Sequence, residues 1–204
     1  LMTDIDRFSG YVLAGGKSLR MGSDKAFLPF RDSNFLHLAM RTLAEATGRP
    51  SKVVVSDFKR NLFTESLPAD SIVTDVFEDR GALGGIHAAL ADTETHFCVV
   101  LAVDLPLVTT ESVGILMDAV VRDGSDAVVI EQHDGRLQPL FGVYRTETCL
   151  PLLENLIKVH GDLSVRDLLA RIRTSTVSQS DISSNPEFLI NVNDRTSYAN
   201  LLQQ

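Results

Sequence analysis

Short runs of apolar, often β-branched residues alternate with longer amphipathic stretches along most of this chain. Five runs have the length and composition of buried strands: residues 11–14, 53–56, 71–74, 97–103 and 126–130. The stretches between them are candidate helices. Alternating strands and helices form right-handed βαβ units, so the pattern predicts a three-layer, Rossmann-like α/β fold with a mostly parallel sheet.

Polar capping residues and glycines mark the ends of two predicted helices. Asn34 precedes an amphipathic stretch that ends before Gly48, and Thr109 or Thr110 precedes one that ends before Gly124. A short polar side chain at the start of a helix accepts a hydrogen bond from an otherwise unpaired N–H group. Glycine after the last turn adopts the left-handed conformation that ends a helix.

One segment predicts an exception to the parallel order. Residues 133–136, His-Asp-Gly-Arg, form a turn signal between the apolar runs 128–130 and 137–144. Such a turn joins antiparallel neighbours. Pro139 has no backbone N–H group to donate, which favours an edge position. We therefore expect a mixed sheet that contains one hairpin, with Pro139 near an edge.

The composition limits the classes of function. The chain has 204 residues, 44% of them hydrophobic, and we expect one domain over residues 1–204. A net charge of −8 argues against nucleic acid as a partner. The longest apolar run, residues 97–103, is too short to span a membrane and no leader is evident, so we expect a cytoplasmic protein. Cys98 and Cys149 form no metal-ligand pair and are expected in the core.

The candidate chemistry begins in the loop after the first predicted strand. Residues 13–25 read Leu-Ala-Gly-Gly-Lys-Ser-Leu-Arg-Met-Gly-Ser-Asp-Lys. Ligands of open α/β sheets bind beyond the carboxyl ends of the strands, where Gly15 and Gly16 let backbone N–H groups face a polyphosphate. Arg20 and Lys25 add cationic donors for phosphate oxygens. The string is neither a Walker A loop nor G-x-G-x-x-G, which argues against an NAD-linked dehydrogenase.

A carboxylate follows the most apolar of the predicted strands. Asp104 comes directly after residues 97–103, where a charge has no packing role, and it faces the same crevice as the first loop. A hard carboxylate oxygen at that place suits Mg²⁺. The two segments together predict a site for a triphosphate and a magnesium ion.

These residues carry a resemblance to a known family. The string at residues 13–25 resembles the signature LAGGxSxRMGxDK of the molybdenum cofactor guanylyltransferases and matches it at every fixed position. Further segments resemble the family in the same order over nearly the whole chain: Asp75 and residues 81–86, 103–106, 138–140 and 191–193. The resemblance implies a nucleotidyltransferase fold and the transfer of GMP from GTP onto molybdopterin, with release of pyrophosphate.

The resemblance also implies roles at the nucleotide end of the site. The positions that would bind GTP or the ion are Leu13, Ala14, Gly15, Gly16, Lys25, Asp75 and Asp104. Family members commonly have an asparagine at the end of the second strand, where this chain has Ser56 followed by Asp57. Either side chain can accept from the guanine N–H groups. Gly15 and Gly16 favour GTP as the nucleotide. Because the usual asparagine is missing, CTP stays an alternative substrate.

The carboxy-terminal part is expected to bind the acceptor. Asn191 and Asn193 alternate along a predicted strand just before Asp194, which should cap the last helix. By resemblance, this Asn-x-Asn pair contributes to binding of the second substrate, and an asparagine joins the metal aspartate in related nucleotidyltransferases. Arg166 is a further candidate contact for the pterin-bearing substrate.

The implied reaction is an in-line attack by the terminal phosphate of molybdopterin on the α-phosphorus of GTP. Arg20 and Lys25 on the phosphates, with Mg²⁺ on Asp104, would supply the charge neutralisation that such transfers need. Two alternatives stay open: nucleotidyl transfer with CTP or to another small phosphorylated acceptor, and a nucleotide-sensing or partner-binding module without turnover. GTP, molybdopterin and transient contacts with other proteins of cofactor biosynthesis are the expected partners.

Overall fold

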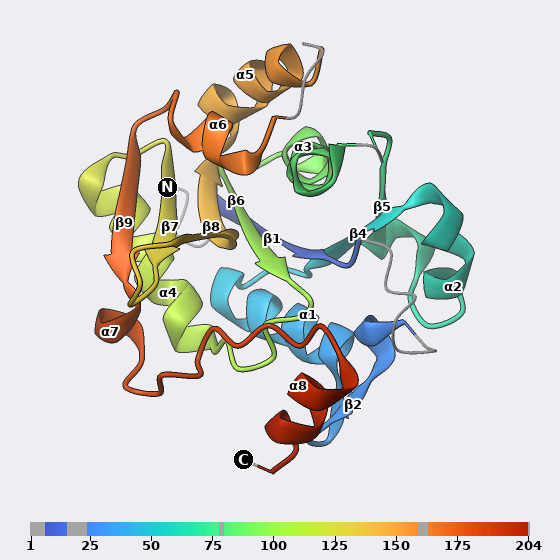
Figure 1. Ribbon diagram of the computed structural model, residues 1–204. Helices are drawn as coiled ribbons and strands as arrows, with labels where there is room; N and C mark the ends of the chain where they lie inside the picture. Colours follow the sequence, from blue (N-terminus) through green and yellow to red (C-terminus); the bar gives the residue numbers. More distant parts are fainter. Residues whose placement is uncertain (1–6, 16–23, 78–79, 159–162, 204) are drawn as a thin grey trace.

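Seven strands form one mixed sheet in the order β5-β4-β1-β6-β8-β7-β9. The computed structural model describes residues 7–15, 24–77, 80–158 and 163–203 (Figure 1). The strands are β1 (Phe8–Leu13), β4 (Lys52–Ser56), β5 (Ile72–Asp75), β6 (Phe97–Ala102), β7 (Ala127–Glu131), β8 (Leu137–Arg145) and β9 (Thr174–Ser178). All of them run in one direction except β8, which is antiparallel to both neighbours. The mostly parallel, mixed sheet expected from the sequence is confirmed.

Strand β8 lies inside the sheet, between β6 and β7, so the edge position expected for Pro139 is wrong. Two local features let a proline occupy this strand. The pairing of β6 with β8 ends at Phe141, which leaves Pro139 beyond the end of β6. On the other side, the register between β7 and β8 shifts after Val129. Pro139 therefore stands where neither neighbour requires a regular ladder hydrogen bond from it.

Helices cover both faces of the sheet (Figure 1), and buried side chains form two hydrophobic clusters. One core, which includes Val12, packs against α1 (Phe35–Thr47) and α4 (Thr110–Asp123). The other core, which includes Leu13, packs against α3 (Ala82–Asp92), α5 (Thr146–Lys158) and α6 (Val165–Leu169). Neighbouring residues of a strand point to opposite faces, which explains why Val12 and Leu13 belong to different cores. Cys98 and Cys149 are both buried in the second core, as predicted.

The predicted helix ends are confirmed. The Asn34 side chain accepts a hydrogen bond of 2.9 Å from the His37 N–H group at the start of α1, and Gly48 ends that helix with a φ of 66°. At the start of α4, Thr109 and Ser112 form a capping box, and Gly124 ends the helix in the left-handed conformation. Helix α1 packs against β1 and β6, the two strands that lead into the loops expected to bind the ligand, and α4 packs against α1 and against β7, β8 and β9.

Shorter elements complete the structure: η3 (Lys25–Phe27), β2 (Pro29–Phe30), β3 (Ser33–Asn34), η4 (Asp57–Lys59), α2 (Arg60–Thr64), η5 (Ala69–Ser71), α7 (Gln179–Ile182) and α8 (Arg195–Leu201). The strand expected around Asn191 and Asn193 is absent from this described segment, which is an irregular chain. Asp194 caps α8, as predicted. In the part of the chain that is described, no helix has the length and apolar character needed to cross a membrane.

Candidate active site

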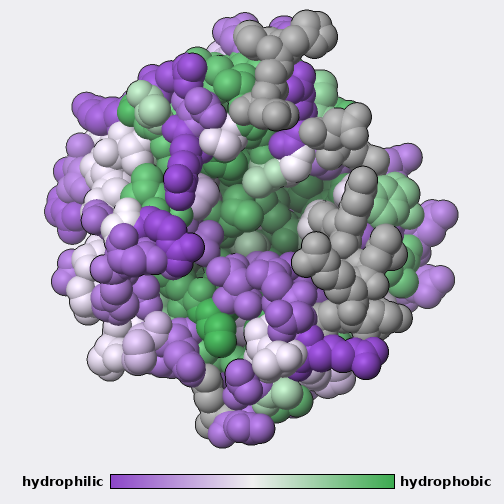
Figure 2. Space-filling view, in the orientation of Figure 1, coloured by the Kyte–Doolittle hydropathy of each residue, from purple (hydrophilic) through white to green (hydrophobic). Residues whose placement is uncertain are grey.

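A cavity of about 660 Å³ opens at the carboxyl ends of β1, β4, β5 and β6. The middle of this face of the molecule is hollowed, and the floor of the hollow is hydrophobic (Figure 2). Its lining combines apolar side chains, such as Leu13 and Val54, with a few polar ones. A cavity of this size and position is typical of a small-molecule site in an open α/β sheet.

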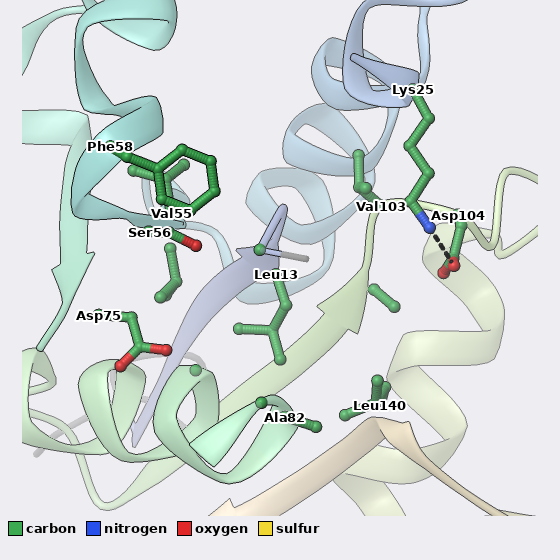
Figure 3. A pocket seen from close by; sticks show the side chains of 15 residues that line it. Leu13, Lys25, Val55, Ser56, Phe58, Asp75, Ala82, Val103, Asp104 and Leu140 are labelled. Atoms are coloured by element: carbon green, nitrogen blue, oxygen red, sulfur yellow. Dashed lines mark hydrogen bonds and ion pairs between the residues drawn. The ribbon is translucent and has the colours of Figure 1, made fainter. Parts of the chain in front are cut away.

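Lys25, Asp104 and Asn193 meet at one end of the cavity (Figure 3 shows the first two). The Lys25 ammonium donates to Asp104 Oδ2 at 2.6 Å and to Asn193 Oδ1 at 3.3 Å. Asp24 accepts a hydrogen bond from the Ala26 N–H group and so caps η3, the short helix that carries Lys25. The three side chains come from three separate parts of the sequence and are brought together by the fold.

Backbone hydrogen bonds hold the segment that carries Asp104 in position. The Val103 N–H group donates to the carbonyl of Leu13, which ties the end of β6 to the end of β1. The Val192 N–H group donates to the carbonyl of Asp104 at 3.0 Å. The irregular segment around Val192 thus runs beside the end of β6, and this contact places Asn193 next to Asp104 although no strand forms there.

The oxygen atoms at this end of the cavity suit a hard cation. The Lys25 ammonium lies between a carboxylate oxygen of Asp104 and an amide oxygen of Asn193, so a positive charge already occupies their shared position. Mg²⁺ prefers oxygen ligands and commonly takes one or two from carboxylates and the rest from phosphates and water. Among the described residues, no group of three or more His, Cys, Asp or Glu side chains could hold a metal alone. Asp104 and Asn193 together offer two oxygen atoms to such an ion.

Ser56 and Asp75 lie across the cavity from Lys25 (Figure 3). They are paired positions at the ends of β4 and β5, and both are buried. The Phe77 N–H group donates to Asp75 Oδ1 at 2.7 Å, which fixes the carboxylate. A Cβ atom on Gly84 would lie 2.6 Å from Asp75 Oδ2, so glycine is needed for α3 to approach this side chain. The first turn of α3 thereby reaches the cavity wall, where Gly81, Ala82 and Gly85 line the cavity.

Residues 10–177 match the family of MobA-like NTP transferase domains. The chain belongs to this family. A probable molybdenum cofactor guanylyltransferase of Bacillus subtilis is 31% identical over 191 residues, with 92% of this chain and 91% of the relative covered. A relative of the same name in Flavobacterium johnsoniae is 28% identical over 169 residues, which are 82% of this chain and 83% of the relative.

Solved structures show the same fold. The molybdopterin-guanine dinucleotide biosynthesis protein A of Archaeoglobus fulgidus superposes with a TM-score of 0.79 at 21% identity, covering 96% of this chain and 97% of that protein. Rv0371c of Mycobacterium tuberculosis, solved as a complex with manganese, has a TM-score of 0.65 at 21% identity and covers 97% of this chain and 99% of its own. The fold expected from the sequence, a nucleotidyltransferase α/β fold, is therefore confirmed.

The MobA-like fold brings most of the expected site residues to one cavity. Those that line it are Leu13, Gly15, Lys25, Ser56, Asp75 and Asp104. Asn193 joins them through its hydrogen bond with Lys25, whereas the Asn191 side chain donates a long hydrogen bond, 3.5 Å, to the Leu189 carbonyl and is not among the residues that line the cavity. Ala14 is buried at the end of β1, where its N–H group donates to the Val54 carbonyl. Gly16 and Arg20 lie outside the described residues. Arg166 lines a separate, open hollow beside the β7–β8 turn.

The structure adds two neighbouring residues that the sequence reasoning missed. Phe58 lines the cavity, and 64% of its surface is exposed. Lys59 is buried, and its ammonium lies 2.7 Å from Asp24 Oδ2. A weak signal was present in the sequence: Phe58 is a large apolar residue within the charged segment 57–60, at the end of a strand, where no core position is expected.

Proposed function

We propose that this protein transfers GMP from GTP onto the terminal phosphate of molybdopterin and releases pyrophosphate. The observation that carries the proposal is the convergence of Lys25, Asp104 and Asn193 at one end of a nucleotide-sized cavity. Membership of the MobA-like family and the relatives named molybdenum cofactor guanylyltransferase support it.

Each polar group at this end has a part in the proposed reaction. Lys25, together with Arg20, would bind the phosphates of GTP and compensate their charge. Asp104 and Asn193 would hold Mg²⁺ through their oxygen atoms. Once bound, the ion would neutralise negative charge on the phosphate oxygens. The acceptor phosphate is already anionic, so no side chain needs to remove a proton from it.

The bond changes balance without a covalent enzyme intermediate. An oxygen of the molybdopterin phosphate forms a bond to the α-phosphorus of GTP while the bond from that phosphorus to the bridging oxygen breaks. The bridging oxygen leaves with the electron pair as part of pyrophosphate. The chain's residues contribute position and charge, which are the main requirements of such a transfer.

The opposite end of the cavity would bind the nucleoside. Ser56 and Asp75 present oxygen atoms at the ends of adjacent strands, and both residues line the wall opposite Lys25. Guanine N–H groups and ribose O–H groups can donate hydrogen bonds to such oxygen atoms. The carboxy-terminal part, which includes Asn191 and Asn193, would face the acceptor.

We also propose that residues 1–204 form one domain and that the protein acts in the cytoplasm, where GTP is available.

A nucleotide panel tests the assignment. The melting temperature of the protein is measured with GTP, CTP, ATP and UTP, each with Mg²⁺. A nucleotide present at about 100 times its Kd adds about 2.7 kcal/mol of stability, so the four can be ranked. We expect the largest shift with GTP, and pyrophosphate release only when molybdopterin is added. A larger shift with CTP would instead identify a cytidylyltransferase, and binding without release would favour a nucleotide-sensing module.

A further inference from the structure

One exposed, large apolar side chain lines the cavity. Among the described residues, six large apolar side chains are exposed, and four of them follow the ends of β4 and β5: Phe58, Leu62, Val76 and Phe77. Phe58 is the one that lines the cavity. Its ring stands beside Ser56 and Val55, on the side of the cavity opposite Lys25 and Asp104 (Figure 3). An aromatic ring left 64% exposed at the mouth of a ligand site needs an explanation.

The two residues that follow Phe58 anchor its segment to the rest of the fold. Lys59 reaches inward, and its ammonium forms an ion pair of 2.7 Å with Asp24, in which both side chains are less than a tenth exposed. Arg60 donates to the Thr74 hydroxyl at 2.7 Å and so binds the segment to β5. A few residues further on, Phe63 is completely buried. The exposed ring is therefore presented by a fixed segment.

Such an arrangement suits stacking against a flat ligand. An aromatic side chain on a rigid support binds a nucleobase through its face, with little loss of conformational entropy. Ser56, two residues earlier, and Asp75, on the adjacent strand, offer the oxygen atoms that recognise the edge of a base. Edge recognition and face recognition would thus come from the ends of the same two strands.

We propose that Phe58 is the stacking platform for the base of the bound nucleotide, and that the Lys59–Asp24 ion pair holds this platform in position. The inference deepens the proposed function and rests on it, because the base is that of GTP. The ring contributes binding energy and orientation at the end of the cavity remote from Lys25. It takes no part in the bond changes.

Direct binding measurements on exposed-residue variants test the stacking. Phe58→Ala should weaken GTP binding by at least about fivefold, which is the lower end of what removal of a stacking aromatic costs. Phe58→Tyr should bind within about twofold of the wild type. Leu62→Ala is the matched control, since Leu62 is an exposed apolar residue of the neighbouring helix α2 that does not line the cavity.

Inorganic triphosphate separates loss of the base contact from general damage. It has no base, so it should bind the wild type and Phe58→Ala equally well through the Lys25 end. Equal losses for GTP and triphosphate, or GTP binding by Phe58→Ala within twofold of the wild type, would overturn the platform. If the wild type binds GTP but releases no pyrophosphate with molybdopterin, the proposed reaction fails while the stacking result stands. A wild type that binds none of the four nucleotides would overturn both.

Fluorescence gives an independent readout, because the chain contains no tryptophan. Phe58→Trp introduces a single indole at the platform, and stacking with guanine should quench its emission as GTP is added. Leu202→Trp, at an exposed position near the end of the chain, is the control and should show no saturable quenching. Equal emission of Phe58→Trp with and without saturating GTP would contradict the inference.

Discussion

Removal of one partner of the ion pair between Lys59 and Asp24 should strongly destabilise the fold. The two charged groups are 2.7 Å apart, and the exposed fractions of their side chains are 9% and 7%. Lys59→Met keeps a long, flexible side chain but removes the ammonium. The Asp24 carboxylate then stays buried without its counter-charge, while it still caps η3 through the Ala26 N–H group.

The magnitude follows from the burial of the pair. Removal of one partner of a buried pair typically costs about 3–5 kcal/mol, because the remaining charge is left unpaired in a poorly solvated place. We expect a loss of this size in the free energy of unfolding for Lys59→Met. The double variant Asp24→Asn with Lys59→Met leaves no buried charge, so it should lose less than the single variant. Lys59→Arg should recover most of the wild-type stability.

Urea unfolding followed by circular dichroism measures these differences, since the chain has no tryptophan to report them. Lys52→Met is the matched control, because the Lys52–Asp92 pair has a similar distance, 2.8 Å, but side chains that are 38% and 28% exposed. Its expected cost is about 1 kcal/mol or less. Should both lysine variants lose the same stability, burial would not be what gives the Lys59–Asp24 pair its importance.

Three further predictions concern single residues. Asp104→Asn should lower the rate of pyrophosphate release by at least about 10²-fold at nearly unchanged melting temperature, and a folded variant within threefold of the wild-type rate would contradict the role of Asp104. Gly84→Ala should weaken GTP binding in calorimetry, because its Cβ atom would lie 2.5 Å from the Phe77 carbonyl oxygen and 2.6 Å from Asp75 Oδ2 and so displace the segment that carries the carboxylate; unchanged affinity would disprove this. Burial lowers the pKa of His87 in the folded protein, so below a pH of about 6.5 the unfolded chain binds a proton more readily and the free energy of unfolding decreases as the pH falls. His87→Leu should reduce this loss of stability between about pH 7 and 5 in urea titrations, and an unchanged pH profile would refute the prediction.

Elements with a local signal could be predicted from the sequence, and those that depend on distant partners could not. The ends of α1 were readable because Asn34 and Gly48 act on their immediate neighbours. Strand β9 was missed because it pairs with β7 alone and has no fully buried residue, so it lacks an apolar run. The position of Pro139 depended on a register shift after Val129, in the other strand of the hairpin, which no feature near the proline indicates.

The same distinction separates the two kinds of residue in the site. Lys25 and Asp104 could be identified because each belongs to a motif and follows a strand whose carboxyl end must face the ligand. Lys59 stands among charged residues in a segment typical of a solvated surface, and a lysine is rarely buried unless it is paired. Its partner, Asp24, is itself part of the signature string, adjacent to Lys25. The ion pair therefore joins the segment that carries Phe58 to the segment that carries Lys25. If these segments bind the base and the phosphates as proposed, the ion pair connects the two, and a change at Lys59 should then weaken the binding of both GTP and inorganic triphosphate.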